Sequence, residues 1–393
     1  MQEKYRSLSQ AHERKSSRIE AKAREKMNLV IDIGTTNIIF FDGQRKTLFR
    51  NPQYRFGSDI MSRILHAMQK GQKIQTQLLR EILVEGFFSF LKDKKIQSLV
   101  IVANTVQLHF LLGLDISGMA TFPFTPLEFF GRSFSLDAVF GDLAMKIAPL
   151  FSEKNTEVFI PACFDAFIGA DLLAASLGVG LWQLKEKASH FDANFAETSQ
   201  LLIDIGTNTE LVLRHRGKNL VASTAAGPAF EGGKTKSELK GSELLHALSL
   251  MLSQGQMDAT GFILVEKPLL CQEDVRVLQL AKAAIRAAVD TLLFEMQIDA
   301  EEIDAVFIAG AFGSHIEVKD IEKTGLLDGV LAKKISLREN AVLDGAFLCA
   351  KAVHEADFHA LSSLVEKEFS QTTLVQLADN AFFAKAYIEA MSF

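Results

Sequence analysis

The stretch LVIDIGTTNIIFF at residues 29–41 recurs as LLIDIGTNTELVL at residues 201–213. Six of the thirteen aligned positions are identical, at a constant offset of 172 residues. Repeats of solenoid proteins are separated by tens of residues, so this offset instead predicts two copies of one structural half in a single chain. In each copy an apolar run leads to Asp and Gly-Thr, and a second apolar run follows. This order predicts two strands joined by a tight turn, once in each half.

The turns of the two copies are suited to binding phosphate. Gly34 and Gly206 lack a side chain, so the backbone can bend sharply there and a phosphate can come close. The N–H groups that follow can point at the anion, and threonine hydroxyls add further donors. The sequence therefore predicts phosphate binding by Gly34, Thr35, Thr36 and Asn37 in the first copy and by Gly206, Thr207 and Asn208 in the second.

Three acids are the predicted catalytic residues. Asp32 and Asp204 each end an apolar strand, where an acid is costly unless it is paired or bound to an ion. Mg²⁺ carried by a nucleotide would meet that need, so both are also the predicted metal-binding residues. Asp171 opens a predicted helix after Gly169 and is a candidate for binding the metal or orienting a water. The alternative is structural: two hairpin acids and one acid that complements a helix dipole.

The second half adds candidates for the rest of a nucleotide. Glu210 stands where the first copy has Ile38 and is expected to hold Mg²⁺ or a lysine, with an exposed strand position as the alternative. Gly227 opens the glycine-rich segment GPAFEGG, which allows a ligand to lie against the backbone. A strand near residues 305–309 ends in a second glycine-rich turn that can accept the flat face of an adenine. The predicted adenosine residues are Gly310, Ala311 and Gly313.

Four further polar residues have two interpretations each. Asn104 and Thr105 close a predicted strand at residues 98–104, at the edge where open α/β sheets bind ligands, or they simply cap a helix. Lys282 and Arg286 lie one turn apart on an apolar helix. They are expected either to reach the nucleotide or to extend their charged ends to solvent.

Composition limits the function classes. The chain of 393 residues is 48% hydrophobic and has a net charge of −6, so it lacks the overall basic field of a nucleic-acid-binding protein. No apolar run reaches the length of a membrane span, and residues 1–26 lack the apolar core of a signal peptide. We therefore expect a cytoplasmic protein without membrane or nucleic-acid partners. A homodimer is compatible with the sequence.

The chain has three cysteines, which are far apart in the sequence: Cys163, Cys271 and Cys349. They form no C-x-x-C pair and cannot supply the four thiolates of a typical iron–sulfur cluster. We expect them to be small buried hydrophobic residues, and we expect no iron–sulfur cluster in this chain.

Four segments are predicted along the chain. Residues 1–26, with eight Lys/Arg and four Glu, form a basic arm that is disordered or helical. Residues 27–185 form lobe I with the first phosphate turn, and residues 186–350 form lobe II with the second phosphate turn and the adenosine turn. Residues 351–393 form a C-terminal helical segment.

These motifs together resemble a known superfamily. The two DIGT turns and the later AGAFG resemble the phosphate-1, phosphate-2 and adenosine motifs of the actin, sugar kinase and Hsp70 ATPase (ASKHA) superfamily. Five motifs, in this order along the chain, are similar to those of the reductive activator of corrinoid proteins. They are NPQ-x-x-F-G-S-D-I-x-S-R-I, ANTVQLHFLLGLD, GPAFEGG, QLAKAAIRA, and AGAFG followed by GLLD. The resemblance runs from Met27 to Phe393.

The resemblance implies an α/β fold of two duplicated, RNase H-like lobes, as in actin, each with a mixed sheet. It further implies that ATP–Mg²⁺ binds between the lobes and that the ATPase helps to reduce an inactive cobalamin protein from Co(II) to Co(I). The family's usual members begin with a ferredoxin-like [2Fe–2S] domain, which this sequence does not show. We therefore expect a corrinoid protein as partner and a separate electron donor.

Two other function classes stay open. A small-molecule kinase of the same superfamily would use Asp171 or Asp165 as a base toward a substrate hydroxyl and would need a polar sugar-binding loop in lobe I. The loop PFTPLEFF at residues 123–130 is instead aromatic and apolar, which suits a protein partner better. A non-enzymatic, actin-like scaffold would polymerise with nucleotide, which a sedimentation assay detects.

Overall fold

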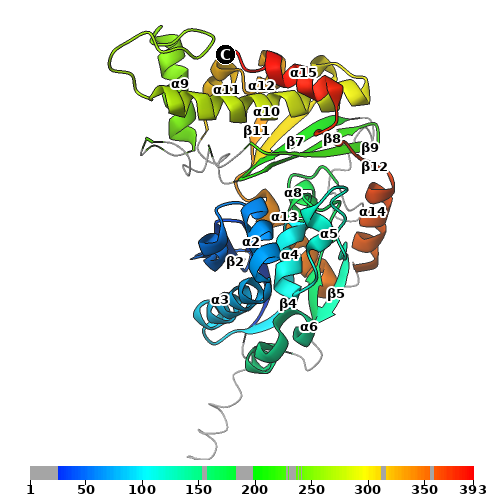
Figure 1. Cartoon of the computed structure of the whole chain (residues 1–393). Coiled ribbons are helices and arrows are strands. Elements are labelled where there is room, and N and C mark those ends of the chain that lie inside the picture. Colours follow the sequence, from blue (N-terminus) through cyan, green and yellow to red (C-terminus); the bar gives the residue numbers. More distant parts are fainter. Residues whose placement is uncertain are drawn as a thin grey trace, which may run out of the picture.

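The computed structural model describes residues 25–152, 157–182, 198–226, 229, 236–237, 239, 241–310, 316–354 and 358–393. Within them the chain forms two six-stranded mixed sheets with helices against both (Figure 1). We call the part built on the first sheet lobe I and the part built on the second sheet lobe II.

The elements of lobe I are β1 (Lys26–Ile33), β2 (Asn37–Phe41), β3 (Lys46–Arg50), η1 (Pro52–Phe56), α2 (Ile60–Lys70), α3 (Lys73–Leu91), β4 (Lys95–Ala103), α4 (Thr105–Leu112), α5 (Ser117–Ala120), β5 (Arg132–Ser135), α6 (Leu136–Phe140), η2 (Gly141–Leu143), α7 (Ala144–Ile147), η3 (Ala148–Leu150), β6 (Glu157–Ile160) and α8 (Ala170–Gly178). Those of lobe II are β7 (Ser199–Ile205), β8 (Thr209–His215), β9 (Lys218–Thr224), α9 (Ser242–Ser253), α10 (Gln272–Met296), η5 (Ala300–Glu302), β10 (Ala305–Ala309), α11 (Val318–Thr324), α12 (Gly329–Ala332) and β11 (Ile335–Leu337). The chain continues with α13 (Ala341–His354), α14 (Phe358–Ser370), β12 (Thr372–Leu374) and α15 (Ala381–Glu389).

Both sheets contain the same antiparallel meander, as the repeat predicts. In lobe I the strand order is β3-β2-β1-β4-β6-β5, and β1 to β3 form the meander while β4 runs parallel to β1. In lobe II the order is β11-β10-β7-β8-β9-β12, and β7 to β9 form the meander while β10 runs parallel to β7. The predicted fold class, two actin-like lobes with mixed sheets, is therefore confirmed.

The lobe II sheet is buried on both faces, because successive side chains of a strand point to opposite faces. On β7, Leu201 and Ile203 pack into a core with α9 and α10. Leu202 between them packs into the core that contains lobe I, α8 and α13. Figure 1 shows the corresponding layers, with α10 and α15 on one side of this sheet and α8 and α13 between the two sheets. One hydrophobic core therefore continues from lobe I into lobe II.

Helices α8 and α13 cross in close contact between the sheets. A Cβ atom on Gly345 would lie 1.7 Å from the carbonyl oxygen of Ala174, and one on Gly178 would lie 1.9 Å from that of Ala341. Only glycine allows the two helix backbones to come this close. Helix α13 also packs against β1 and β4. The predicted boundary at residue 350 falls within α13, which packs against α8, β1 and β4 of lobe I and also against α14.

The C-terminal segment is attached to lobe II. Strand β12 pairs with β9 at the edge of the sheet. Arg214 of β8 and Glu368 of α14 form a buried ion pair of 2.5 Å, and Asn219 of β9 donates to the same carboxylate at 3.0 Å. This buried network, in which the charges are paired and hydrogen-bonded, fixes α14 to the sheet. Across the described residues, every helix is too short or too polar to cross a membrane.

Candidate functional site

Both phosphate turns of the repeat border one cavity of about 360 Å³ between the lobes. Lobe I contributes the turn between β1 and β2, and lobe II contributes the turn between β7 and β8. The predicted residues that line this cavity are Asp32, Gly34, Thr35, Thr36, Asn37, Asn104, Asp171, Asp204, Gly206, Thr207, Asn208, Glu210 and Gly310. Gly227, Ala311 and Gly313 lie outside the described residues, so their contact with a nucleotide stays a prediction.

The acids reach the cavity from three elements. Asp32 lies near the end of β1 and Asp204 near the end of β7, at equivalent positions of the two meanders. Asp171 lies in the first turn of α8, the helix that crosses between the sheets. The Leu172 N–H donates to Asp171 Oδ1 at 3.0 Å. Duplication of the meander and the position of α8 thus bring three distant carboxyl groups to one site.

The carboxyl groups at the cavity have raised pKa values because they are removed from water and repel each other. Burial, followed by the charges of Asp171 and Asp204, raises the pKa of Asp32 to about 8. Burial and then Asp171 raise the pKa of Asp204 to about 7. Burial raises the pKa of Asp171 to about 6, although backbone N–H groups lower it in part.

Glu210 is the fourth acid of this cluster. It lies directly opposite Asp204 in the β7–β8 pair, where two like charges repel. Burial, and then the charges of Asp171 and Asp204, raise its pKa well above the usual value. An exposed strand position, the alternative for this residue, is ruled out because Glu210 is half-buried in the cavity wall.

The cluster fits a hard divalent cation. Its four members offer only carboxylate oxygens, the ligands that Mg²⁺ and Ca²⁺ prefer. The described lysine that lines the cavity, Lys46, donates instead to Glu339 Oε1 at 3.0 Å and to Asn340 Oδ1 at 3.2 Å. No described Lys or Arg is among the causes that act on these four pKa values. A cation with oxygen coordination would supply positive charge there.

The first phosphate turn is held by two buried side chains that the sequence reasoning did not assign. Asn51 Nδ2 donates to the carbonyl oxygen of Gly34 at 2.8 Å, and Arg63 Nη2 donates to that of Thr35 at 2.7 Å. The Asn51 N–H also donates to the carbonyl oxygen of Thr36 at 2.9 Å. Both residues belong to the NPQ…SRI motif, which is therefore the sequence signal for this support. These bonds fix the turn's backbone before a ligand binds.

Several residues of the cavity wall were also not foreseen. Lys46 of β3 joins lobe I to the start of α13 through Glu339 and Asn340. The others are apolar: Ile39, Leu48, Val342 and Leu343. They come from the first meander and from α13, so they identify α13 as part of the site as well as of the core.

The remaining polar candidates divide between the site and the core. Asn104 lines the cavity and also caps α4, since its Oδ1 accepts from the Gln107 N–H at 2.9 Å. Thr105 is buried, and its hydroxyl donates to the carbonyl oxygen of Asp165 at 2.5 Å. Arg286 pairs with Asp290 at 2.8 Å, and Lys282 packs 5.0 Å from the Phe393 ring. Neither Lys282 nor Arg286 lines the described part of the cavity, so their contact with a nucleotide stays a prediction.

Two of the three cysteines are buried. Cys163 and Cys349 are buried, and Cys271 is half-buried at the start of α10. Burial raises the pKa of Cys349 to about 12, and it raises the pKa of Cys163 further still. Metal centres require thiolates, so these two thiols are poor cluster ligands.

Replacing Gly310 with alanine is expected to destabilise the protein by about 1–3 kcal/mol and to weaken nucleotide binding. Gly310 has a φ of +86°, and a Cβ there would lie 2.6 Å from Asp204 Oδ1 and 2.4 Å from the Ile205 carbonyl oxygen. Gly71→Ala is a matched control, because Gly71 has a φ of +84° but no atom within 4 Å of the added Cβ. Denaturant unfolding should give a larger loss for Gly310→Ala, and equal losses would contradict the clash.

Two lobes with equivalent sheets and an acid-lined cavity between them define the ASKHA class of fold, which uses nucleotides and metals. The chain matches the family models "RACo middle region" over residues 27–184 and "C-terminal domain of RACo the ASKHA domain" over residues 198–244 and 262–393. The chain therefore belongs to the RACo family, whose middle and C-terminal regions it contains.

Three known proteins are similar to this chain. The chain is 26% identical to the corrinoid activation enzyme RamQ of Eubacterium limosum, over 92% of this chain and 69% of that one. It is 23% identical to the [Co(II) methylated amine-specific corrinoid protein] reductase of Methanosarcina barkeri, over 78% of this chain and 66% of that one. The chain thus spans about two thirds of the length of these relatives.

The third is a solved structure with the same fold. The reductive activator for corrinoid, iron-sulfur protein superposes with a TM-score of 0.76 at 24% identity, over 95% of this chain and 67% of that chain.

Proposed function

We propose that this chain binds ATP with Mg²⁺ in the cavity between its lobes and uses ATP hydrolysis to drive reductive activation of a corrinoid protein. The observation that carries the proposal is the convergence of two phosphate-type turns and four acids on one cavity. The names of the relatives, a corrinoid activation enzyme and a corrinoid protein reductase, indicate the class of partner.

Each group at the cavity has a role in this proposal. The two turns bind the phosphates through backbone N–H groups and hydroxyls. Asp32 and Asp204 hold the metal, and Asp171, whose pKa of about 6 lets it accept a proton near neutral pH, orients the attacking water. Gly310, together with Ala311 and Gly313, receives the adenosine. When bound, Mg²⁺ neutralises charge on the phosphates during transfer.

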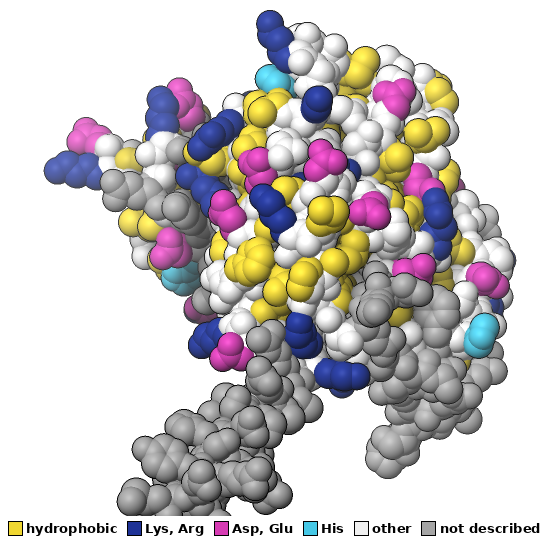
Figure 2. Space-filling view, turned by 90° about the horizontal axis from the view of Figure 1, so that it is seen from below, with side chains coloured by type: hydrophobic (Ala, Val, Ile, Leu, Met, Phe, Trp, Pro, Cys, Tyr) yellow, Lys and Arg dark blue, Asp and Glu magenta, His cyan; other side chains and the backbone are white. Residues whose placement is uncertain are grey.

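A protein partner is supported by the surface of lobe I. The predicted aromatic loop exposes Leu127 by 67% and Phe129 by 46%, and Phe122 directly before the loop is 73% exposed. Exposed apolar groups of this size are typical of protein contacts. The face of the molecule shown in Figure 2 carries hydrophobic, basic and acidic side chains interspersed, without an extended field of one sign among the coloured residues. That face therefore does not favour nucleic acid.

The electrons come from a separate donor in this proposal. The chain has three cysteines, and burial keeps Cys163 and Cys349 protonated. The role of this chain is then to couple ATP hydrolysis to an electron transfer between two other redox groups.

The direct test mixes the chain, Mg²⁺–ATP, a Co(II) corrinoid protein and an added reductant, and follows the absorption of Co(I). We expect Co(I) to form with ATP but not with ADP, and not without the added reductant. Activation without any reductant would contradict the separate donor. An active ATPase that gives no ATP-dependent Co(I) with several corrinoid proteins would contradict the partner and favour a kinase.

Nucleotide binding is tested separately by calorimetry. We expect ATP to bind with a dissociation constant in the range of about 1 μM to 1 mM that is usual for substrate sites. Binding should weaken when EDTA removes Mg²⁺, because the acid cluster then repels the phosphates. Absence of binding heat and of a thermal shift with ATP, ADP and analogues would exclude the whole proposal.

A further inference from the structure

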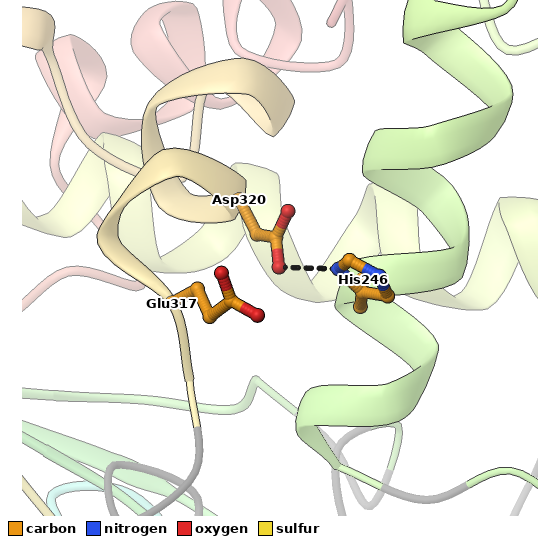
Figure 3. Close-up of side chains that lie close together, drawn as sticks. All are labelled: His246, Glu317 and Asp320. Atoms are coloured by element: carbon orange, nitrogen blue, oxygen red, sulfur yellow. Dashed lines mark hydrogen bonds and ion pairs between the residues drawn. The ribbon is translucent and has the colours of Figure 1, made fainter.

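A second group of metal-ligating side chains lies in lobe II, away from the cavity between the lobes. His246 of α9 faces Glu317 and Asp320 at the start of α11 (Figure 3). One ligand atom from each residue lies within 4.8 Å of the other two. The three side chains line a cavity of about 390 Å³ that is bordered also by Leu239, Ser242, Glu243, Ala247, Leu250 and Leu269.

Existing contacts orient all three side chains. His246 Nδ1 and Asp320 Oδ2 are 2.9 Å apart, so the imidazole is fixed with respect to the carboxylate. Glu317 pairs with Lys319 through Oε2 at 2.5 Å, which leaves Oε1 available. His246 and Glu317 are partly exposed, so an ion can reach them from solvent.

Asp320 is the residue whose environment indicates a bound ligand. Its side chain is 3% exposed, yet Oδ1 has no hydrogen-bond partner among the residues that the structure describes. A buried carboxylate with one unsatisfied oxygen is costly unless a charge compensates it. The neighbouring Glu317 and Glu243 are also acidic, and Lys319 is bonded to Glu317. An ion that binds between these groups would neutralise the excess of negative charge.

We propose that His246, Glu317 and Asp320 form a site for a divalent cation of the Zn²⁺ class. One imidazole nitrogen with two carboxylates is a ligand set for Zn²⁺ and other first-row transition metals, whereas Mg²⁺ prefers oxygen ligands alone. The ion replaces the hydrogen bond between His246 and Asp320 and connects α9 to α11. This site is independent of the proposed ATPase function.

The test measures Zn²⁺ binding to the full chain after treatment with EDTA, by calorimetry and by thermal unfolding. We expect the wild type to bind one Zn²⁺ more per chain than His246→Gln, or to bind it at least about tenfold more tightly. Zn²⁺ should raise the unfolding temperature of the wild type more than that of His246→Gln, because the ion binds only the folded state. Glu322→Gln is the matched control, since Glu322 is an exposed acid on the same helix.

The acid cluster between the lobes can also take Zn²⁺, and a spectroscopic readout separates the two sites. Co²⁺ bound with an imidazole in a site of low coordination number should give visible bands that His246→Gln lacks. Glu317→Gln, at a largely exposed position, gives a second variant if His246→Gln fails to fold. Equal Zn²⁺ binding and equal Co²⁺ spectra in the wild type and the folded variants would overturn the site, as would an equal loss in Glu322→Gln.

Discussion

Replacing Asp204 with asparagine is expected to lower the rate of ATP hydrolysis roughly 100-fold or more, the size of effect seen when one charged or hydrogen-bonding group of a preorganised site is removed. Asp204 ends β7 beside the second phosphate turn, and its pKa of about 7 reflects burial among other acids. Asparagine keeps the shape of the side chain but cannot neutralise a bound cation. The measurement is phosphate release at saturating Mg²⁺–ATP, which reports the loss as a change in kcat.

The control for this substitution is Asp137→Asn. Asp137 is an exposed acid in the first turn of α6, outside the cavity, so its replacement should leave hydrolysis within error of the wild type. Asp204→Asn should also unfold at a temperature no lower than the wild type, because it removes repulsion with Asp32 and Glu210. If the folded variant hydrolyses ATP at the wild-type rate, Asp204 is a structural acid and the metal assignment is wrong.

The two halves of the fold could be predicted because the signal was local and duplicated. Each DIGT turn follows an apolar run and precedes another, so strand, turn and strand are specified within thirteen residues. Asp32 and Asp204 lie at equivalent strand ends because of that duplication, and both line one cavity.

The parts that the sequence did not show depend on contacts between distant segments. Helix α13 follows β11 in the sequence but packs on lobe I, and the glycines that permit this, Gly178 and Gly345, are far apart in the chain. Nothing in a helix's own periodicity identifies which lobe it will cover. For the same reason Lys46, Glu339 and Asn340 could not be assigned to one site from sequence.

For Lys282 and Arg286 the structure shows contacts that the sequence did not indicate. Their spacing on an apolar helix was compatible with reaching a ligand, but periodicity does not say what covers that helix face. In the structure Arg286 forms an ion pair with Asp290, one helical turn away, and Lys282 Nζ lies 5.0 Å from the centre of the Phe393 ring. Arg286 is therefore paired within lobe II, whereas burial lowers the pKa of Lys282 to about 8.

The acid cluster also predicts that the metal-free, nucleotide-free protein becomes less stable as the pH rises. The usual pKa of an Asp is 3.8, whereas in the folded protein the pKa values are about 8 for Asp32, about 7 for Asp204 and about 6 for Asp171. Between pH 4 and pH 8 the folded state therefore holds protons that the unfolded state has lost. The stability that these protonated acids contribute to the folded state is fully present below about pH 4, and it is lost as the pH rises through 6 to 8.

The substitution Asp32→Asn should reduce this dependence, because asparagine stays neutral at every pH in the range. At pH 8 the metal-free variant should be more stable than the metal-free wild type, and the difference should shrink toward pH 5. Thermal unfolding in EDTA from pH 5 to pH 8 measures this, with Asp137→Asn as the control. Parallel curves for the wild type and Asp32→Asn would show that Asp32 is ionised throughout.

Binding of Mg²⁺–ATP is expected to release protons at pH 6.5. A cation among the acids favours their charged forms, so Asp32 and Asp204, protonated at this pH in the free protein, should ionise when the metal binds. Calorimetry in two buffers with different ionisation enthalpies gives the number of protons released. We expect at least about one proton per bound nucleotide in the wild type and fewer in Asp32→Asn. A binding heat that is independent of the buffer would mean that the acids are already ionised. Metal binding would then not change their protonation.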